Sequence, residues 1–277
     1  MTKFVVAVSG GVDSVVLLHM LANQSDRELI VAHFDHGIRD DSHLDAELVL
    51  DLAKKYNLQF ETRREELGKK ASEELARDRR YEFLREIAKK YDAQIITAHH
   101  ADDVIESIAI NLSRGTGWRG LAVLDSDITR PLTSFTKSEI LDYAKKHKLT
   151  WRDDITNSTD KYLRNRIRQK TDKLLNDKKR QLLALWAGQK STKKMINEEV
   201  KRIIGNGPNY SRHFFIHIEE SVGLECLRYI TNAQLTRPQM VKVLHKIKTS
   251  LPKKSYQAGG GIKIDFTSRN FTVELIK

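Results

Sequence analysis

Apolar residues in the first two thirds of the chain form short continuous runs, which are separated by longer stretches of helical periodicity. The runs lie at residues 4–8, 29–34 and 93–98, with a shorter one near 58–62. Such runs are typical of strands that are buried on both faces of a parallel sheet. Residues 72–91 instead place apolar side chains at i, i+3, i+4 and i+7, as an amphipathic helix does. The alternation predicts an α/β fold with a doubly wound, mostly parallel sheet.

The last third of the chain has a different pattern. A helical stretch over about 182–204 ends at a Gly-Asn-Gly-Pro break, and two shorter helical stretches follow it. Alternating apolar residues at 262–266 and 271–275 predict a β-hairpin, and the glycines at 259–261 predict a flexible connector before it. We therefore expect a catalytic α/β domain over residues 1–180, a basic helical linker over 181–205 and a small α+β domain over 206–277.

Positive charge is concentrated in one segment. The whole chain has a net charge of +11, and the segment from Lys161 to Arg202 contains 14 Lys and Arg against 4 Asp and Glu. The remainder of the chain is therefore close to neutral. A field concentrated in this way favours a polyanion partner, and the alternative is an ordinary solvated helical surface.

The number of cysteines and the hydropathy of the chain indicate in which cellular compartment the protein is expected. The single cysteine, Cys226, cannot form an internal disulfide, which favours a reducing environment. The chain enters its first strand directly, and no apolar run approaches 18 residues. We expect a soluble, cytoplasmic protein with no membrane partner.

The turn after the first predicted strand has the composition of an anion-binding loop. It consists of Ser9, Gly10, Gly11, Val12, Asp13 and Ser14. The glycines allow a phosphate to approach the backbone, and the following helix offers its N–H groups and its dipole. An acid among such groups, Asp13, predicts a divalent cation. The alternatives fit less well: a Walker loop needs a lysine here, a dinucleotide-binding turn needs a third glycine, and an ordinary tight turn needs no acid.

Other candidate residues follow later strands. His36 and Arg39 come after the second strand, where they would contact a nucleotide, although a lone histidine is as often structural. Arg77 and Arg80 crowd the N-terminal half of a helix, where the dipole disfavours cations, which suggests a role beyond folding. A solvated basic face is the alternative.

An acidic pair begins the helix after the fourth strand. Asp103 and Glu106 lie at i and i+3, on one helix face, and suit a cationic substrate amine. Their ordinary role would be N-terminal helix charge. Arg114 and Arg119 flank glycines further along, and this composition indicates a mobile loop near phosphate or RNA.

Taken in order, eight segments resemble one family. They are SGGVDS, HFDHGIR, ARDRRYEFL, TAHHADDVIES, LSRGTGWRGL, RPL, WRDDITN and YLRNRIR. The first resembles the PP-loop of ATP pyrophosphatases, and the whole set resembles the bacterial tRNA(Ile)-lysidine synthases, closely over residues 3–170. Val104 and Ser107 stand where that family usually has Gln and Thr, so a polar contact is expected to be lost.

The resemblance implies a fold and a reaction. The fold would be of the PP-loop, adenine nucleotide α-hydrolase type. ATP would adenylate the C2 oxygen of the cytidine at the first anticodon position of an isoleucine tRNA with a CAU anticodon, releasing pyrophosphate. The ε-amine of L-lysine would then displace AMP. The product, lysidine, would change the identity and the codon reading of the tRNA from methionine to isoleucine.

The resemblance also implies residue roles. ATP would be bound by residues 9–14 together with His36, Arg39 and Arg80, and Mg²⁺ by Asp13. The catalytic residues would be Asp13, Asp103, Glu106 and Arg77, with Asp103 and Glu106 binding lysine. The tRNA would meet the small C-terminal domain and five arginines: Arg114, Arg119, Arg164, Arg166 and Arg168.

Two other classes of function stay open. One is a different PP-loop enzyme, but a thiolase would need more than one cysteine and an amidating synthetase would need an ammonia source. The other is a non-catalytic RNA-binding module, which explains the basic segment but not Asp13 or the acidic pair. The oligomeric state is also open, with a homodimer as one option.

Overall fold

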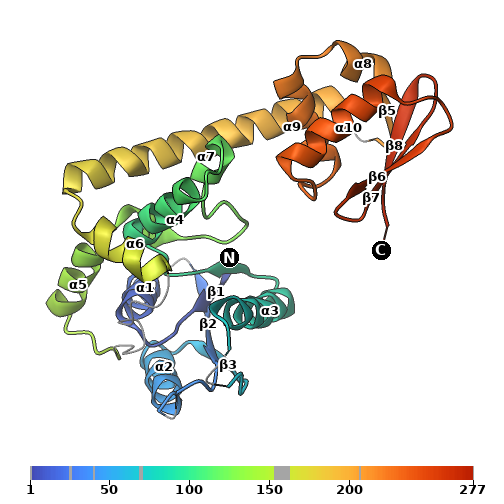
Figure 1. Cartoon of the computed structure of the whole chain (residues 1–277). Helices are drawn as coiled ribbons and strands as arrows, with labels where there is room; N and C mark the ends of the chain where they lie inside the picture. The colour runs from blue at the N-terminus through green and yellow to red at the C-terminus, as the bar shows by residue number, and fades with distance from the viewer. Residues whose placement is uncertain are drawn as a thin grey trace. The chain divides into compact units, whose positions relative to one another are not determined.

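Four parallel strands form a sheet in the N-terminal part of the computed structural model (Figure 1). Val5 of the first strand is paired with Ile30 on one side and with Ile95 on the other. The spatial order is β3-β2-β1-β4. The strands are β1 (Lys3–Ala7), β2 (Glu28–Asp35), β3 (Gln59–Arg64) and β4 (Gln94–Ile96). The predicted parallel α/β sheet is thus confirmed.

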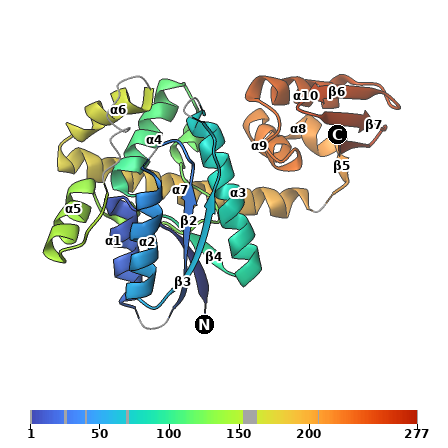
Figure 2. The ribbon, with the colours of Figure 1, turned by 90° about the horizontal axis from the view of Figure 1, so that it is seen from below.

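Helices cover both faces of this sheet. Figure 2 shows α1 and α2 on one side of the strands and α3 on the other. Val6 packs into a core with α1, α2 and α5, whereas Val5 packs with α3, because neighbouring strand residues point to opposite faces. These helices are α1 (Val12–Ala22), α2 (His43–Lys55), α3 (Glu73–Tyr91) and α5 (Lys137–Lys146).

The winding direction reverses beside β1. The chain moves outward from β1 to β3, and α3 then returns it to place β4 on the other side of β1. In open α/β sheets, ligands bind at the carboxyl ends of strands where the winding reverses. The ends of β1 and β4 therefore define the place to look for a site.

The structure describes residues 2–24, 27–39, 41–68, 71–152, 163–205 and 207–276. The chain divides into two compact units, Met1–Lys190 and Ser191–Lys277. The first unit is completed by α4 (Ala101–Ser113), η1 (Trp118–Leu121), η2 (Pro131–Ser134), α6 (Leu163–Asp172) and the start of α7 (Asn176–Ile204). The expected division by function, into catalytic domain, linker and tRNA-contacting domain, stays a prediction.

The second unit has its own core around an antiparallel sheet. Its helices are α8 (Arg212–His217), α9 (Glu220–Ile230) and α10 (Arg237–Thr249). Its strands, in spatial order, are β5 (Asn209–Ser211), β8 (Asn270–Leu275), β7 (Ile262–Phe266) and β6 (Ser255–Gly259). Arg212 is buried and donates to the carbonyls of Ile247, Thr267 and Ser250 at 2.7–2.9 Å. Cys226 is fully buried, and burial raises the pKa of its thiol to about 11.

Two expectations for the second unit have different outcomes. The hairpin at 262–266 and 271–275 is confirmed, with Ile264 paired to Val273. The prediction of a flexible connector at 259–261 is wrong, because Gly259 ends β6 and Gly260 and Gly261 form the turn to its paired strand β7. All three have positive φ values, from 57° to 85°, which glycine adopts without strain.

No helix in the described ranges combines the length and the apolar character needed to cross a membrane.

Candidate functional site

The glycine turn lies between β1 and α1, where the winding of the sheet reverses. Gly10 has a φ of +92°, and a side chain there would meet Asp45 of α2 at 3.4 Å. Ser14 is buried, accepts the Ser9 N–H at 3.1 Å and donates to the Gly11 carbonyl at 2.9 Å. Ser14 therefore holds the shape of the turn. The α1 N-terminus has no side-chain cap, so its N–H groups suit an anion.

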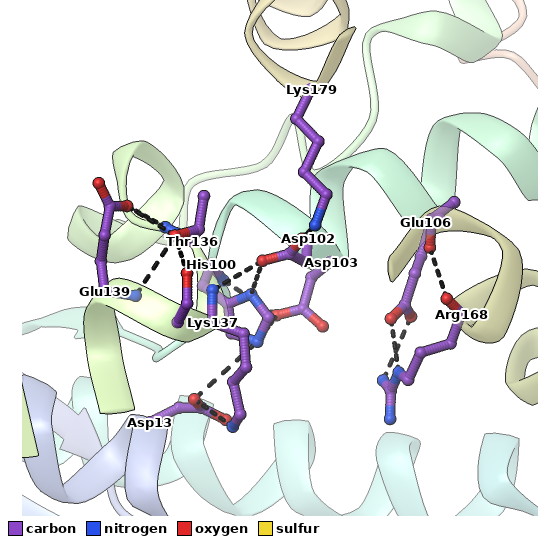
Figure 3. A network of polar contacts seen from close by, with 12 residues as sticks. Asp13, His100, Asp102, Asp103, Glu106, Thr136, Lys137, Glu139, Arg168 and Lys179 are labelled. Carbon is purple, nitrogen blue, oxygen red and sulfur yellow. Dashed lines mark hydrogen bonds and ion pairs between the residues drawn. The ribbon is translucent and has the colours of Figure 1, made fainter. Parts of the chain in front are cut away.

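Asp13 is the acid of this turn, and a lysine from α5 is bound to it. Lys137 Nζ donates to Asp13 Oδ1 at 2.6 Å, although 124 residues separate the two in sequence. His100 Nε2 lies 3.9 Å from the same oxygen (Figure 3). The Asp13 side chain is 30% exposed, so it is accessible to a ligand as well as to Lys137.

Helix α4 begins beside the turn with two acids. The His100 N–H donates to Asp103 Oδ2 at 2.9 Å, as part of a capping box. The carboxylate of Asp102 is buried and accepts from Lys179 Nζ at 2.6 Å and from the Lys137 N–H at 2.7 Å. Burial opposes ionisation of Asp102, but these two hydrogen bonds, together with the charges of Lys179 and His100, outweigh it and hold its pKa below the ordinary value.

Glu106, one turn further along α4, is paired with an arginine of α6. Its carboxylate is 2% exposed and accepts from Arg168 Nε at 2.5 Å and from Nη2 at 3.2 Å (Figure 3). The bidentate contact raises the pKa of Arg168. The structure thus joins a residue expected to bind lysine to one expected to bind RNA.

The remaining arginines that were expected to bind RNA are dispersed. Arg114 is the exposed C-cap of α4, and Arg119 lies over the Trp118 ring at 4.7 Å. Arg166 is exposed on α6. The side chain of Arg164 lies outside the described residues.

Three of the candidates, His36, Arg77 and Arg80, belong to a cationic cluster that also contains His99, the residue that follows β4 at a distance of three positions. Burial lowers the pKa of His36 to about 4, and the charge of Arg80 adds to this effect. Burial also lowers the pKa of His99 to about 4, with Arg130, Arg77 and Arg80 adding to it against Asp103. Arg77 and Arg80 both lie over the ring of Tyr81, at 4.9 and 5.5 Å.

Arg39, the other expected nucleotide contact, is bound to α2. It donates to Asp45, whose other carboxylate oxygen accepts from Arg152 at 2.7 Å. Arg39 therefore holds Asp45, the α2 residue that lies beside Gly10 of the glycine turn.

Among the residues of this site that sequence reasoning missed are Lys137, Asp102 and Lys179. Lys137 lies between Thr136 and Glu139, the two residues of a capping box, so its sequence context is that of an ordinary first-turn residue of α5. The Asp-Asp pair at 102–103 signalled acids at a helix start but not which one is buried. No local pattern distinguishes Lys179 from Lys178.

Val104 and Ser107, the two departures from the resembled family, each have a clear local contact. Val104 is fully buried and packs with Ile108 and Val123. Ser107 donates to the Asp103 carbonyl at 2.8 Å. The substituted side chains thus serve packing and a local hydrogen bond.

A family model described as a PP-loop domain matches residues 1–175. Among solved structures, a U34-tRNA thiolase from Methanococcus maripaludis shares the fold, with a TM-score of 0.58 at 16% identity, covering 69% of this chain and 71% of that one.

Curated relatives extend the similarity. The tRNA(Ile)-lysidine synthase of Thermotoga maritima is 38% identical over 185 residues, which cover 62% of this chain and 45% of the relative. That of Bacillus cereus is 41% identical over 187 residues, covering 61% and 39%. That of Thermosipho africanus is 32% identical over 277 residues, covering 92% and 64%. The chain thus spans less than half the length of the first two relatives.

The two histidines predict how stability depends on pH. Their pKa values of about 4 in the folded state lie below the ordinary 6.5, so the unfolded chain takes up protons first as the pH falls. The stability that depends on their neutral rings is complete above pH 6.5 and is lost as the pH falls toward 4. We expect His99→Gln to reduce the slope of the free energy of unfolding against pH, by at most about 1.4 kcal/mol per pH unit.

Urea unfolding between pH 4 and 7, followed by tryptophan fluorescence, measures the effect, because all three tryptophans lie in the first unit. His43→Gln, at an exposed position of α2, is the control and should keep the wild-type slope. Identical slopes for His99→Gln and wild type would contradict the assignment.

Proposed function

Since this chain belongs to the PP-loop domain family, we propose that it is an ATP-dependent ligase that joins L-lysine to the wobble cytidine of an isoleucine tRNA with a CAU anticodon. The observation that carries the proposal is one site in which an uncapped helix N-terminus, the accessible Asp13 and the acidic start of α4 lie together. The similarity to synthases of this name supports the choice of substrates. The single cysteine, which favours a reducing compartment, supports a cytoplasmic location for this activity.

The first step would be adenylation of the base. The cytidine C2 oxygen attacks the α-phosphorus of ATP, a C–O–P linkage forms, and the bond to the bridging oxygen breaks to release pyrophosphate. The N–H groups of the α1 N-terminus and the Ser9 hydroxyl would hold the departing phosphates. Arg77 and Arg80 would balance the phosphate charge from the cluster beside His99.

The acid of the turn fits a magnesium ion. Mg²⁺ is commonly held by one or two carboxylates and by substrate phosphates, so Asp13 suffices on the protein side. The described residues contain no cluster of three or more His, Cys, Asp or Glu. When bound, the ion would neutralise charge on the phosphates of ATP.

The second step would be attack by lysine. Its ε-amine has an ordinary pKa of about 10.4, so it arrives protonated and must lose a proton before it bonds to C2 and AMP departs with the C2 oxygen. Asp103 or Glu106 would accept that proton. Because Arg168 is bound to Glu106, the lysine ammonium would have to replace its guanidinium. An RNA phosphate near α6 would attract Arg168 and favour that exchange.

Lysine transfer tests the proposal directly. The protein is mixed with ATP, labelled lysine and isoleucine tRNA with a CAU anticodon, and a methionine tRNA with the same anticodon is the control. We expect one lysine per isoleucine tRNA, with AMP and pyrophosphate in equal amounts, and no transfer to the control. RNA binding without transfer would favour a non-catalytic module, and AMP formation without lysine would favour another PP-loop enzyme.

Asp13→Asn removes the charge that is predicted to bind magnesium. We expect pyrophosphate release to fall by about 100-fold or more, because phosphate charge in the transition state loses its balance. tRNA affinity, measured by filter binding, should stay within about twofold. Asp51→Asn, at an exposed position of α2, is the control. Equal losses of pyrophosphate release and RNA affinity would contradict the role.

Glu106→Gln keeps an acceptor for Arg168 but removes the charge that lysine would meet. We expect the KM for lysine to rise about tenfold, the equivalent of ~1.4 kcal/mol, while adenylation of the tRNA proceeds at the wild-type rate. Separate assays of AMP transfer and lysine transfer measure the two steps. An unchanged KM for lysine would remove Glu106 from the lysine site.

A further inference from the structure

One lysine of the basic segment is turned into the protein. Near the start of α7, the Lys179 side chain is 12% exposed, whereas Arg180 is 81% exposed and Lys178 is exposed. Lys178 binds only within its own helix among its described hydrogen bonds, to Gln181 at 3.3 Å. Lys179 thus differs from its neighbours in having a buried partner in another helix.

That partner is Asp102, and each of its two oxygens serves a different element. Oδ1 accepts from Lys179 Nζ at 2.6 Å, and Oδ2 accepts from the Lys137 N–H at 2.7 Å (Figure 3). Lys137 is the first residue of α5, so no carbonyl within that helix can accept its N–H. Asp102 therefore fixes the N-terminus of α5.

The side chain of Lys137 completes the connection to the glycine turn. Lys137 Nζ donates to Asp13 Oδ1 at 2.6 Å. A continuous series of contacts therefore runs from α7, through Asp102 of α4 and Lys137 of α5, to the acid of the ATP-binding turn (Figure 3).

Stability alone is a poor explanation for this arrangement. A buried ion pair contributes little net stability, because desolvation opposes its attraction, and two apolar side chains would often do as well. An apolar pair, however, would leave the Lys137 N–H without an acceptor. Asp102, neutralised by Lys179, fixes the position of the first N–H of α5 through a directional hydrogen bond. Apolar packing is not directional and would fix that position less accurately.

We propose that Lys179 is a positioning residue for the ATP site, which acts through Asp102 to hold Lys137 against Asp13. Helix α7 then belongs to the nucleotide site although it is remote from the turn in sequence. The inference rests on the ATP-binding part of the proposed function and not on lysine transfer.

Lys179→Met tests the inference, with Lys178→Met as the matched control. ATP affinity is measured by equilibrium titration of the full chain without RNA, and amide hydrogen exchange is followed at Lys137. We expect Lys179→Met to weaken ATP binding about tenfold and to accelerate exchange at the Lys137 amide at least tenfold. Lys178→Met should change neither quantity by more than about twofold.

Two results would overturn the inference. One is wild-type ATP affinity in Lys179→Met, and the other is weakened affinity accompanied by equally faster exchange throughout the sheet, which would indicate general destabilisation. If the methionine variant does not fold, Lys179→Gln keeps a donor without the charge, and the same comparison decides. Because RNA and lysine are absent from the titration, failure of the proposed ligase activity would not alter its outcome.

Discussion

A carboxylate next to an anion-binding helix end must be balanced by positive charge, and this constraint organises the nucleotide side of the structure. Asp13 would repel phosphate if it stood alone at the α1 N-terminus. The structure supplies Lys137 for the balance, from a helix that follows the whole parallel sheet in sequence. The position of that lysine then depends on Asp102, whose own buried charge depends on Lys179. One acid in a glycine turn thus accounts for contacts among four helices.

The pair of Glu106 and Arg168 follows the same logic one turn further along α4. Glu106 is almost completely buried, and an ionised carboxylate there needs the hydrogen bonds that Arg168 provides. Both pairs join an acid that is predicted to meet a ligand to a cation from another helix. Under the proposed function, lysine binding at Glu106 is an exchange of one cation for another, so that the buried carboxylate stays neutralised.

Local patterns were sufficient to predict the sheet, the turn and several helix ends. The apolar run of β1 and the glycines after it are both encoded within a few residues. The contact between Lys137 and Asp13 was not predictable, because it depends on how α5 packs on α1 and not on a neighbouring residue. Helical periodicity likewise does not tell which of two adjacent lysines is buried. Strand β6 was missed because its alternation is weak and the glycines beside it favoured an irregular segment.

The buried thiol of the second unit has a practical consequence. Cys226 is the only cysteine in the chain, it is inaccessible to solvent, and its pKa of about 11 leaves almost no thiolate at neutral pH. Because thiolate is the reactive form, maleimides and mild oxidants should leave the folded protein unmodified. A cysteine introduced at an exposed position would therefore be the sole reactive one, and a fluorophore or spin label could be attached there without first replacing Cys226.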